Sequence, residues 1–177
     1  IIKAANCELY TYSEESKEAD FVASDIRYVS QPDFVGTEFH ISGKYDMEVR
    51  LGIPGLFNVV NALAAVSVCS FLGLDQARIS HALENIRVNG RMEIVYTSER
   101  CTVLVDYAHN AVSMESLLST LRDYKPKRLV CVFGCGGNRS KDRRYSMGEI
   151  GGKMADLSII TADNSRYEKV EDIIADI

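Results

Sequence analysis

A glycine- and arginine-rich segment, Val130 to Ser146, contains the residue types in this chain that best suit the binding of an anion. An apolar run predicts a strand over 128–133, and a glycine-rich turn follows it. Four cationic side chains come next: Arg139, Lys141, Arg143 and Arg144. Glycines after a buried strand let the backbone turn sharply and approach a ligand closely, and guanidinium groups bind phosphate or carboxylate. The segment therefore predicts an anionic ligand at this strand end.

Two other apolar runs also end in polar side chains. Asp106, Tyr107, His109 and Asn110 follow one of them, and Asp163, Asn164, Ser165 and Arg166 follow the other. The carboxyl ends of parallel strands lie at one edge of a sheet, so we expect the three strand ends to converge. Asp106 is suited either to accept ribose hydroxyls or to cap the next helix, and Asn110 suits that cap equally well. His109 is either a base, a phosphate donor or a structural residue, and Arg166 either clamps a carboxylate or belongs to a plain turn.

Three residues nearer the start of the chain suggest a nucleotide. Asn58 and Asn61 are three apart and share one face of a predicted helix, where they either bond to local backbone or contact a base or sugar. Arg91 either forms a surface ion pair or reaches a ligand between domains. The chain contains no GxxxxGK[ST] loop, so the main cradle for a triphosphate is not expected within it.

The elements that must position these residues change in type along the chain. The first half reads as half-buried antiparallel strands, then a helix over 57–72 that is apolar on nearly every side and is expected to be buried, and then a second helix over 76–86 capped by Asp75. After residue 89 strands alternate with helices, which indicates an α/β fold with a mainly parallel sheet. The expected strands are 20–28, 37–41, 45–51, 91–97, 102–106, 128–133 and 157–161, and the later helices are 113–124, 146–154 and 170–177.

Composition excludes some classes of protein. The 177 residues are 46% apolar, enough for a sizeable core, and the net charge of -5 argues against a general nucleic-acid binder. No apolar run reaches the ~18 residues of a membrane span. The five cysteines form no CxxC pair, so we expect reduced, mostly buried thiols in a cytoplasmic protein, with Cys135 the one candidate for reactivity. The chain has no initiator Met and is expected to be an internal segment of a longer protein.

Taken in order, these motifs resemble the Mur ligase family, and most closely the members that add the third amino acid of the peptidoglycan stem. The resemblance runs from about residue 19 to residue 177. It implies that residues 1–89 are the later part of a central ATP-binding domain, and that residues 90–177 are the first half of a Rossmann-like amino-acid-binding domain. The motifs that carry it are Asn58-x-x-Asn61, Gly90-Arg91-Met92-Glu93, Asp106-Tyr107-Ala108-His109, Gly134-Cys135-Gly136-Gly137-Asn138-Arg139 and Asp163-Asn164-Ser165-Arg166.

The resemblance also implies a role for each matching residue. Asn58 and Asn61 would lie beside the adenine of ATP, and Arg91 and Asp106 near its ribose and phosphates. Arg139 would hold the incoming amino acid. Asp163, Asn164, Ser165 and Arg166 match a motif that selects meso-diaminopimelate, with Ser165 where the motif has proline, so that Arg166 is less restrained. Lys141 and His109 stand beside these motifs as candidate catalytic residues. The ligands for Mg²⁺ would precede residue 1, and no metal site is expected within the chain.

The implied activity is ATP-dependent amide formation through an acyl-phosphate. Its substrates would be a UDP-N-acetylmuramoyl dipeptide, ATP and a diamino acid, with no nucleic-acid partner. The isolated chain would be inactive. Three alternatives remain open: a ligase that adds L-lysine, a ligase like cyanophycin synthetase or folylpolyglutamate synthase, and a non-catalytic nucleotide-binding module. An arginine at position 166 favours diaminopimelate over lysine, because a guanidinium attracts a distal carboxylate and repels an ammonium.

Overall fold

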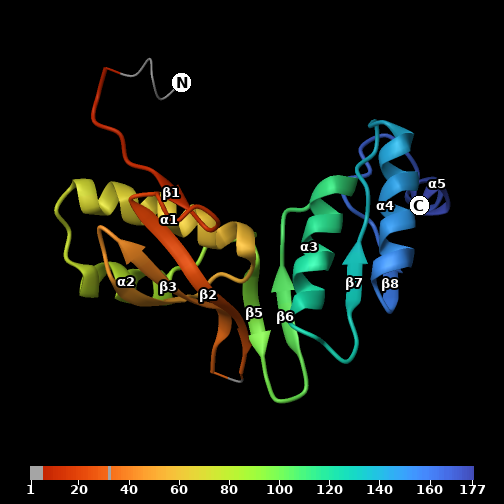
Figure 1. Cartoon of the computed structure of the whole chain (residues 1–177). Helices are drawn as coiled ribbons and strands as arrows, with labels where there is room; N and C mark the ends of the chain where they lie inside the picture. Colours follow the sequence, from red (N-terminus) through yellow and green to blue (C-terminus); the bar gives the residue numbers. More distant parts are fainter. Residues whose placement is uncertain (1–5, 32) are drawn as a thin grey trace. The chain divides into compact units, whose positions relative to one another are not determined.

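The computed structural model describes residues 6–31 and 33–177, so the first five residues of the predicted segment 1–89 lie outside it. The chain divides into two compact units, residues 1–106 and 107–177. Each unit has its own buried core. The units are labelled by element in Figure 1 and are described one at a time below.

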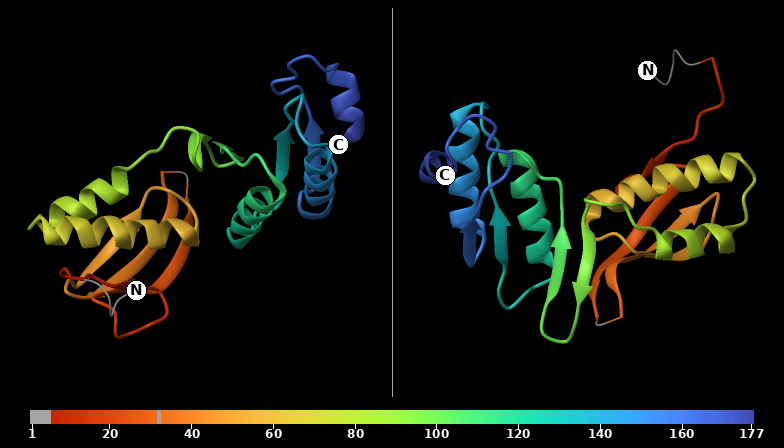
Figure 2. Two further views of the ribbon diagram at one scale, coloured as in Figure 1. Left: turned by 90° about the horizontal axis from the view of Figure 1, so that it is seen from above. Right: turned by 180° about the vertical axis from the view of Figure 1, so that it is seen from behind.

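The first unit is built on a four-stranded sheet whose strands follow chain order. β1 and β2 are parallel, and the two remaining pairs are antiparallel. Two helices follow and lie over the sheet, as Figures 1 and 2 show. The elements are β1 (Tyr12–Ser13), β2 (Phe21–Ser30), β3 (Val35–Gly43), β4 (Met47–Leu51), α1 (Leu56–Phe71) and α2 (Gln76–Asn85).

Period-two alternation in the sequence places the apolar side chains of this sheet on one face. Phe21, Phe39 and Ile41 point from β2 and β3 into the core and are fully buried there with residues of both helices. The opposite face is polar, with Arg50 Nε 3.2 Å from Glu38 Oε1. The predicted half-buried strands are therefore confirmed.

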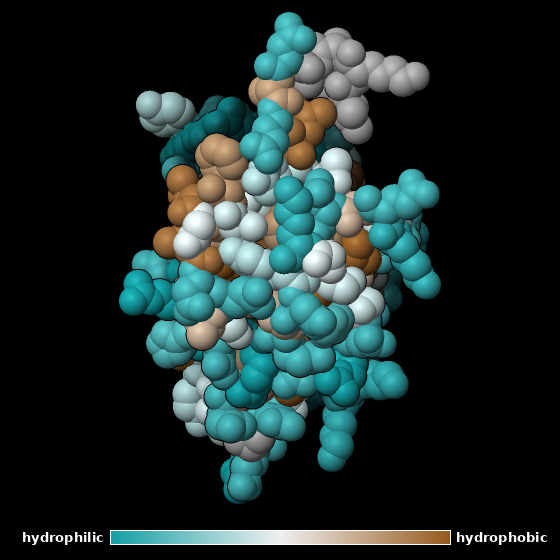
Figure 3. Space-filling model, turned by 60° about the vertical axis from the view of Figure 1, so that its left-hand side comes forward, coloured by the Kyte–Doolittle hydropathy of each residue, from teal (hydrophilic) through white to brown (hydrophobic). Residues whose placement is uncertain are grey.

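Helix α1 differs from its prediction, because it is not buried all round. Val59, Leu63 and Val66 are fully buried against the sheet, whereas Val68 and Phe71 are 59% and 62% exposed. The described elements cover only one side of α1, so an apolar sequence does not by itself guarantee a covered surface. Figure 3 shows one face of the molecule, on which apolar residues form separate patches among hydrophilic ones.

The first unit ends in a hairpin of β5 (Glu93–Thr97) and β6 (Thr102–Val105), which are antiparallel. Asp106 follows β6, and its Oδ2 accepts a hydrogen bond from the backbone N–H of Met92 at 2.8 Å. This bond ties the residue after β6 to the segment that leads into β5.

The second unit contains a parallel pair of strands joined by a helix, as expected for an α/β sheet. β7 and β8 are hydrogen-bonded in parallel, and α4 connects them. Met114, Leu118, Met147 and Ile173 come from the three helices and form the core together with Leu129 and Cys135. The elements are α3 (Ala111–Asp123), β7 (Val130–Phe133), α4 (Lys141–Met154), β8 (Leu157–Ile160) and α5 (Val170–Asp176).

Two helix starts differ from their predictions. Asn110 caps α3, since its Oδ1 accepts from the Ser113 N–H at 2.9 Å, so the helix begins at Ala111. Helix α4 begins at Lys141 and not at 146, with Ser140 in the N-cap position and Asp142 in the first turn. A carboxylate in the first turn is favourable next to the positive end of the helix dipole. Much of the cationic run is therefore helical.

The cysteines are less buried than predicted. All five are free thiols, but only Cys135 is buried, and Cys7 and Cys101 are exposed. Apolar runs placed Cys69 in a helix and Cys131 in a strand without fixing which face of the element they occupy. Within residues 6–31 and 33–177, no helix is both long and apolar enough to cross a membrane.

Candidate functional site

A pocket of about 530 Å³ lies within the second unit, where the segments after β6, β7 and β8 meet. The pocket brings together the three polar stretches that follow these strands, which the sequence analysis predicted to converge. β6 itself pairs with β5 in another sheet, so the predicted convergence does not depend on one continuous three-stranded edge. The lining residues are Tyr107, Ala108, His109, Gly134, Cys135, Gly136, Arg139, Arg143, Met147, Asp163, Asn164 and Arg166.

Glycines allow the loops after β7 and β8 to approach each other closely. A Cβ atom on Gly134 would lie 2.2 Å from the Thr161 carbonyl oxygen, and one on Gly137 would lie 1.8 Å from that of Ser165. The Gly137 N–H donates to the Asn164 carbonyl at 2.8 Å. The glycines thus serve loop–loop packing, which places Arg139 and Arg166 on the same pocket.

The charged groups of this pocket suit a ligand that carries both signs of charge. Arg139, Arg143 and Arg166 supply three guanidinium groups, and Asp163 supplies a carboxylate. Guanidinium groups bind carboxylates through two parallel hydrogen bonds, and a carboxylate accepts from an ammonium group. An amino acid with an additional carboxylate has the matching groups.

The four cations of the predicted anion site have different surroundings. Arg139 and Arg143 line the pocket, whereas Lys141 and Arg144 do not. Lys141 Nζ lies 3.0 Å from Asp176 Oδ2 and donates a hydrogen bond to Asp176 Oδ1 at 3.4 Å, and this hydrogen bond raises the pKa of the lysine. Arg144 is buried in two ion pairs. The carboxylates of these pairs come from the segment after β8, which the sequence pattern did not connect to α4.

The candidate acid–base residues at this pocket have limited contacts. His109 lines the pocket, and its Nδ1 lies 3.0 Å from the carbonyl oxygen of Tyr107, whose ring is 4.9 Å away. Cys135 is buried, burial raises the pKa of its thiol, and its sulfur lies 3.8 Å from that of Met147. A buried thiol with a raised pKa is a poor nucleophile, so the reactive role considered for Cys135 is not supported.

Ser165 does not line the pocket, unlike its neighbours Asp163, Asn164 and Arg166. Its carbonyl accepts from the Glu168 N–H at 3.1 Å, and Arg166 has a φ of 53°. This hydrogen bond therefore restrains the turn at Ser165, where the family motif has proline.

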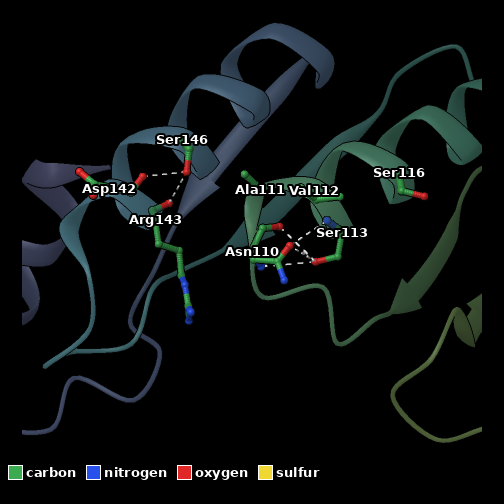
Figure 4. A pocket seen from close by; sticks show the side chains of 8 residues that line it. All are labelled: Asn110, Ala111, Val112, Ser113, Ser116, Asp142, Arg143 and Ser146. Atoms are coloured by element: carbon green, nitrogen blue, oxygen red, sulfur yellow. Dashed lines mark hydrogen bonds between the residues drawn. The ribbon is translucent and has the colours of Figure 1, made fainter.

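Arg143 is the pocket residue that the sequence did not single out from the cationic run. It also lines an open depression of about 800 Å³ beside the first turns of α3 and α4. Figure 4 shows its side chain extending from α4 into the space between the two helices. A helix start at 141 would have been the signal, because it separates Arg143 from Lys141 and Arg144 around the helix axis.

The four residues predicted for a nucleotide lie in the first unit as two pairs. Asn58 Nδ2 donates to the Pro54 carbonyl at 2.7 Å, and Asn61 Nδ2 donates to Asn58 Oδ1 at 3.2 Å. Asn61 is exposed at the start of α1 and is accessible to a ligand. Arg91 and Asp106 lie at the base of the β5–β6 hairpin, on different elements from the asparagines. Asn58 therefore has a local backbone partner, and contact of the two asparagines with a nucleotide stays a prediction.

Magnesium has no evident site among the residues that the structure describes. No group of three or more His, Cys, Asp or Glu side chains is placed there to hold a metal ion. Any step that needs Mg²⁺ is therefore not assigned to these residues.

Two family models match the sequence. The model described as Mur ligase middle domain matches residues 1–69, and that described as Mur ligase, glutamate ligase domain, matches residues 90–177. The chain belongs to the Mur ligase family. The second match begins at residue 90, whereas the compact units of this Mur ligase chain divide after Asp106.

Among curated relatives, a UDP-N-acetylmuramoyl-L-alanyl-D-glutamate–2,6-diaminopimelate ligase from Alkaliphilus oremlandii is 42% identical over 161 residues, covering 90% of this chain and 32% of the relative. A solved structure of a ligase with the same name matches with a TM-score of 0.68 and 32% identity over 94% of this chain and 34% of its own. A folylpolyglutamate synthase from Thermotoga maritima, TM-score 0.71 and 22% identity over 89% of this chain and 36% of its own, shares the fold. The chain spans about a third of the length of the curated relatives it matches.

Proposed function

We propose that this chain is part of an ATP-dependent ligase that adds meso-diaminopimelate to UDP-N-acetylmuramoyl-L-alanyl-D-glutamate in the cytoplasm. The observation that carries the proposal is that Arg139, Arg166 and Asp163 line the same pocket. Two guanidinium groups suit the two carboxylates of diaminopimelate, and Asp163 suits one of its ammonium groups. The names of the relatives agree with this substrate. Free cysteines agree with a reducing compartment.

The proposed reaction has two chemical steps. ATP phosphorylates the γ-carboxylate of D-glutamate, and the amine of diaminopimelate then attacks the acyl-phosphate and releases phosphate. The task of this chain in the second step is to hold the amino acid in a fixed orientation, which lowers the entropic part of the barrier. The step needs no enzyme nucleophile, and the buried Cys135 is consistent with that.

The nucleotide is assigned to the first unit. Asn58 and Asn61 would contact adenine, and Arg91 and Asp106 would lie near the ribose and phosphates. We place the domain boundary at residue 90, with a central ATP-binding domain before it and an amino-acid-binding domain after it. Mg²⁺ would be held outside the described residues.

The test is an amino-acid panel with the full-length protein, comparing meso-diaminopimelate, L-lysine and L-ornithine. We expect ATP-dependent product with meso-diaminopimelate only, because Arg166 would repel a terminal ammonium group. In Arg166→Ala, we expect the ratio of kcat/KM for diaminopimelate to that for lysine to fall by at least about tenfold, since a hydrogen bond to a charged group contributes about 1.5–3 kcal/mol. An unchanged ratio would refute the substrate assignment.

A further inference from the structure

Arg144 is a buried cation that lies outside the pocket and has two carboxylate partners. Its side chain is 1% exposed. Nη2 lies 2.8 Å from Glu168 Oε1, and Nη1 lies 2.8 Å from Asp176 Oδ2. Its two hydrogen bonds raise the pKa of the guanidinium, so it stays charged. Burying the charge of Arg144 beside two partly buried carboxylates costs desolvation free energy, which makes fold stability alone a weak reason for this arrangement.

Glu168 connects this buried cation to the loop after β7. Its Oε1 also accepts a short hydrogen bond from the backbone N–H of Asn138. The Asn138 side chain reaches back in turn, and its Oδ1 accepts from the Tyr167 N–H at 3.3 Å. Two reciprocal bonds therefore join the loop after β7 to the turn after β8.

The joined residues are the immediate neighbours of the two arginines assigned to the amino acid. Asn138 precedes Arg139, and Tyr167 follows Arg166. Asn138 and Arg166 have φ values of 52° and 53°. Asn adopts such values readily, but they are uncommon for arginine, so the turn at Arg166 depends on the contacts that hold it.

We propose that Arg144, Glu168 and Asn138 are positioning residues that fix the spacing between Arg139 and Arg166 for a ligand with two carboxylates. This inference rests on the proposed function, because it takes diaminopimelate as that ligand. Arg144 orients the Glu168 carboxylate, Glu168 fixes the backbone of Asn138, and Asn138 fixes the turn that carries Arg166. The three residues act through the arginines and need not touch the substrate.

Glu168→Gln tests the proposal, because it removes the charge and keeps the size of the side chain. Asp156→Asn is the matched control. The Asp156 carboxylate has the same two kinds of partner, Arg122 Nη1 at 3.0 Å and the Leu129 N–H at 2.6 Å, and like Glu168 it does not line the pocket. Both variants lose a carboxylate that holds an arginine and a backbone amide. Only Glu168 is joined to the pocket loops.

The measurements are kcat, the KM for meso-diaminopimelate, the KM for ATP and the Tm of the full-length protein. We expect Glu168→Gln to raise the KM for diaminopimelate by about 10- to 100-fold, since a misplacement of 1 Å can cost 100-fold, while the KM for ATP changes little. Asp156→Asn should lower the Tm without raising the KM for diaminopimelate. An equal rise in both variants, or none in Glu168→Gln, would overturn the positioning role.

A second variant covers the case in which Glu168→Gln does not fold. Asn138→Gly keeps a backbone that tolerates a φ of 52° and removes only the side chain that accepts from Tyr167. It should raise the KM for diaminopimelate several-fold, and an unchanged KM would overturn the proposal. If the unaltered protein uses ATP but not diaminopimelate, the proposed function fails, and the positioning role fails with it. If the unaltered protein uses diaminopimelate and neither Glu168→Gln nor Asn138→Gly changes the KM for it, only the positioning role is refuted.

Discussion

Replacement of Gly137 by alanine is the sharpest test of how the pocket is assembled. The added Cβ would lie 1.8 Å from the Ser165 carbonyl oxygen, where ordinary contact begins at 3.4 Å. The Ser165 carbonyl belongs to the backbone and cannot rotate away as a side chain could. The two loops must therefore move apart by about 1.6 Å, which is the difference between 3.4 Å and 1.8 Å. The Gly137–Asn164 hydrogen bond, now 2.8 Å, cannot survive that separation.

The expected loss of affinity follows from this displacement. A reacting or binding group misplaced by 1 Å can cost about 100-fold, which corresponds to about 2.7 kcal/mol. We expect Gly137→Ala to weaken the binding of meso-diaminopimelate to the full-length protein by at least that factor. Titration calorimetry in the presence of the nucleotide measures the affinity directly, and circular dichroism checks that the protein is folded.

Gly136→Ala is the matched control for this variant. Its Cβ would meet only the Asn164 carbonyl oxygen at 3.6 Å and the Arg139 Cγ at 4.0 Å, which are ordinary contacts. The two substitutions add the same methyl group at adjacent positions, and Gly136 itself lines the pocket, so a larger loss of affinity in Gly137→Ala than in Gly136→Ala reports loop separation and not the added methyl group. If both variants bind the amino acid equally well, the close approach of the loops is not what assembles the pocket.

Two further predictions concern acid and thiol reagents. The pKa of Glu168 is lowered by its hydrogen bond from Arg144, so its contribution to stability is present above the usual glutamate pKa of about 4.3 and is lost as the pH falls through the lowered value. The difference in urea midpoint between the unaltered protein and Glu168→Gln should therefore shrink as the pH is lowered from 6 to 3; a constant difference would contradict this. Cys7 and Cys101 should react with a thiol reagent in the folded protein, whereas buried Cys135, whose pKa is raised, should react only in urea. Mass spectrometry of labelled peptides distinguishes them.

The succession of strands and helices could be predicted because hydrophobic periodicity is a local property. Alternation over 37–41 reflects one buried face of β3, and Asp75 caps α2 by accepting from the Arg78 N–H at 3.2 Å. Burial is not local in the same way. Helix α1 is apolar around its circumference, yet Phe71 is exposed, because exposure depends on which elements are present to cover it.

The convergence of Arg139, Asp163 and Arg166 on one pocket could be predicted from the topology, because parallel strands end at the same edge. The network behind them could not. Glu168 and Asp176 are ordinary acidic residues of a turn and a helix, and only the folded chain brings them to Arg144.

The phase of helix α4 explains why a run of four cations does two different tasks. Residues three apart share a face of a helix, so Lys141 and Arg144 both reach Asp176. Arg143 points away from that face and lines the pocket, together with Arg139 from the loop before the helix. A helix start at 141 instead of 146 therefore separates Arg143, which lines the pocket, from Lys141 and Arg144, which form ion pairs. Swapping lysine and arginine between positions of this run should therefore alter either the pocket or the ion pairs, even though the net charge is preserved.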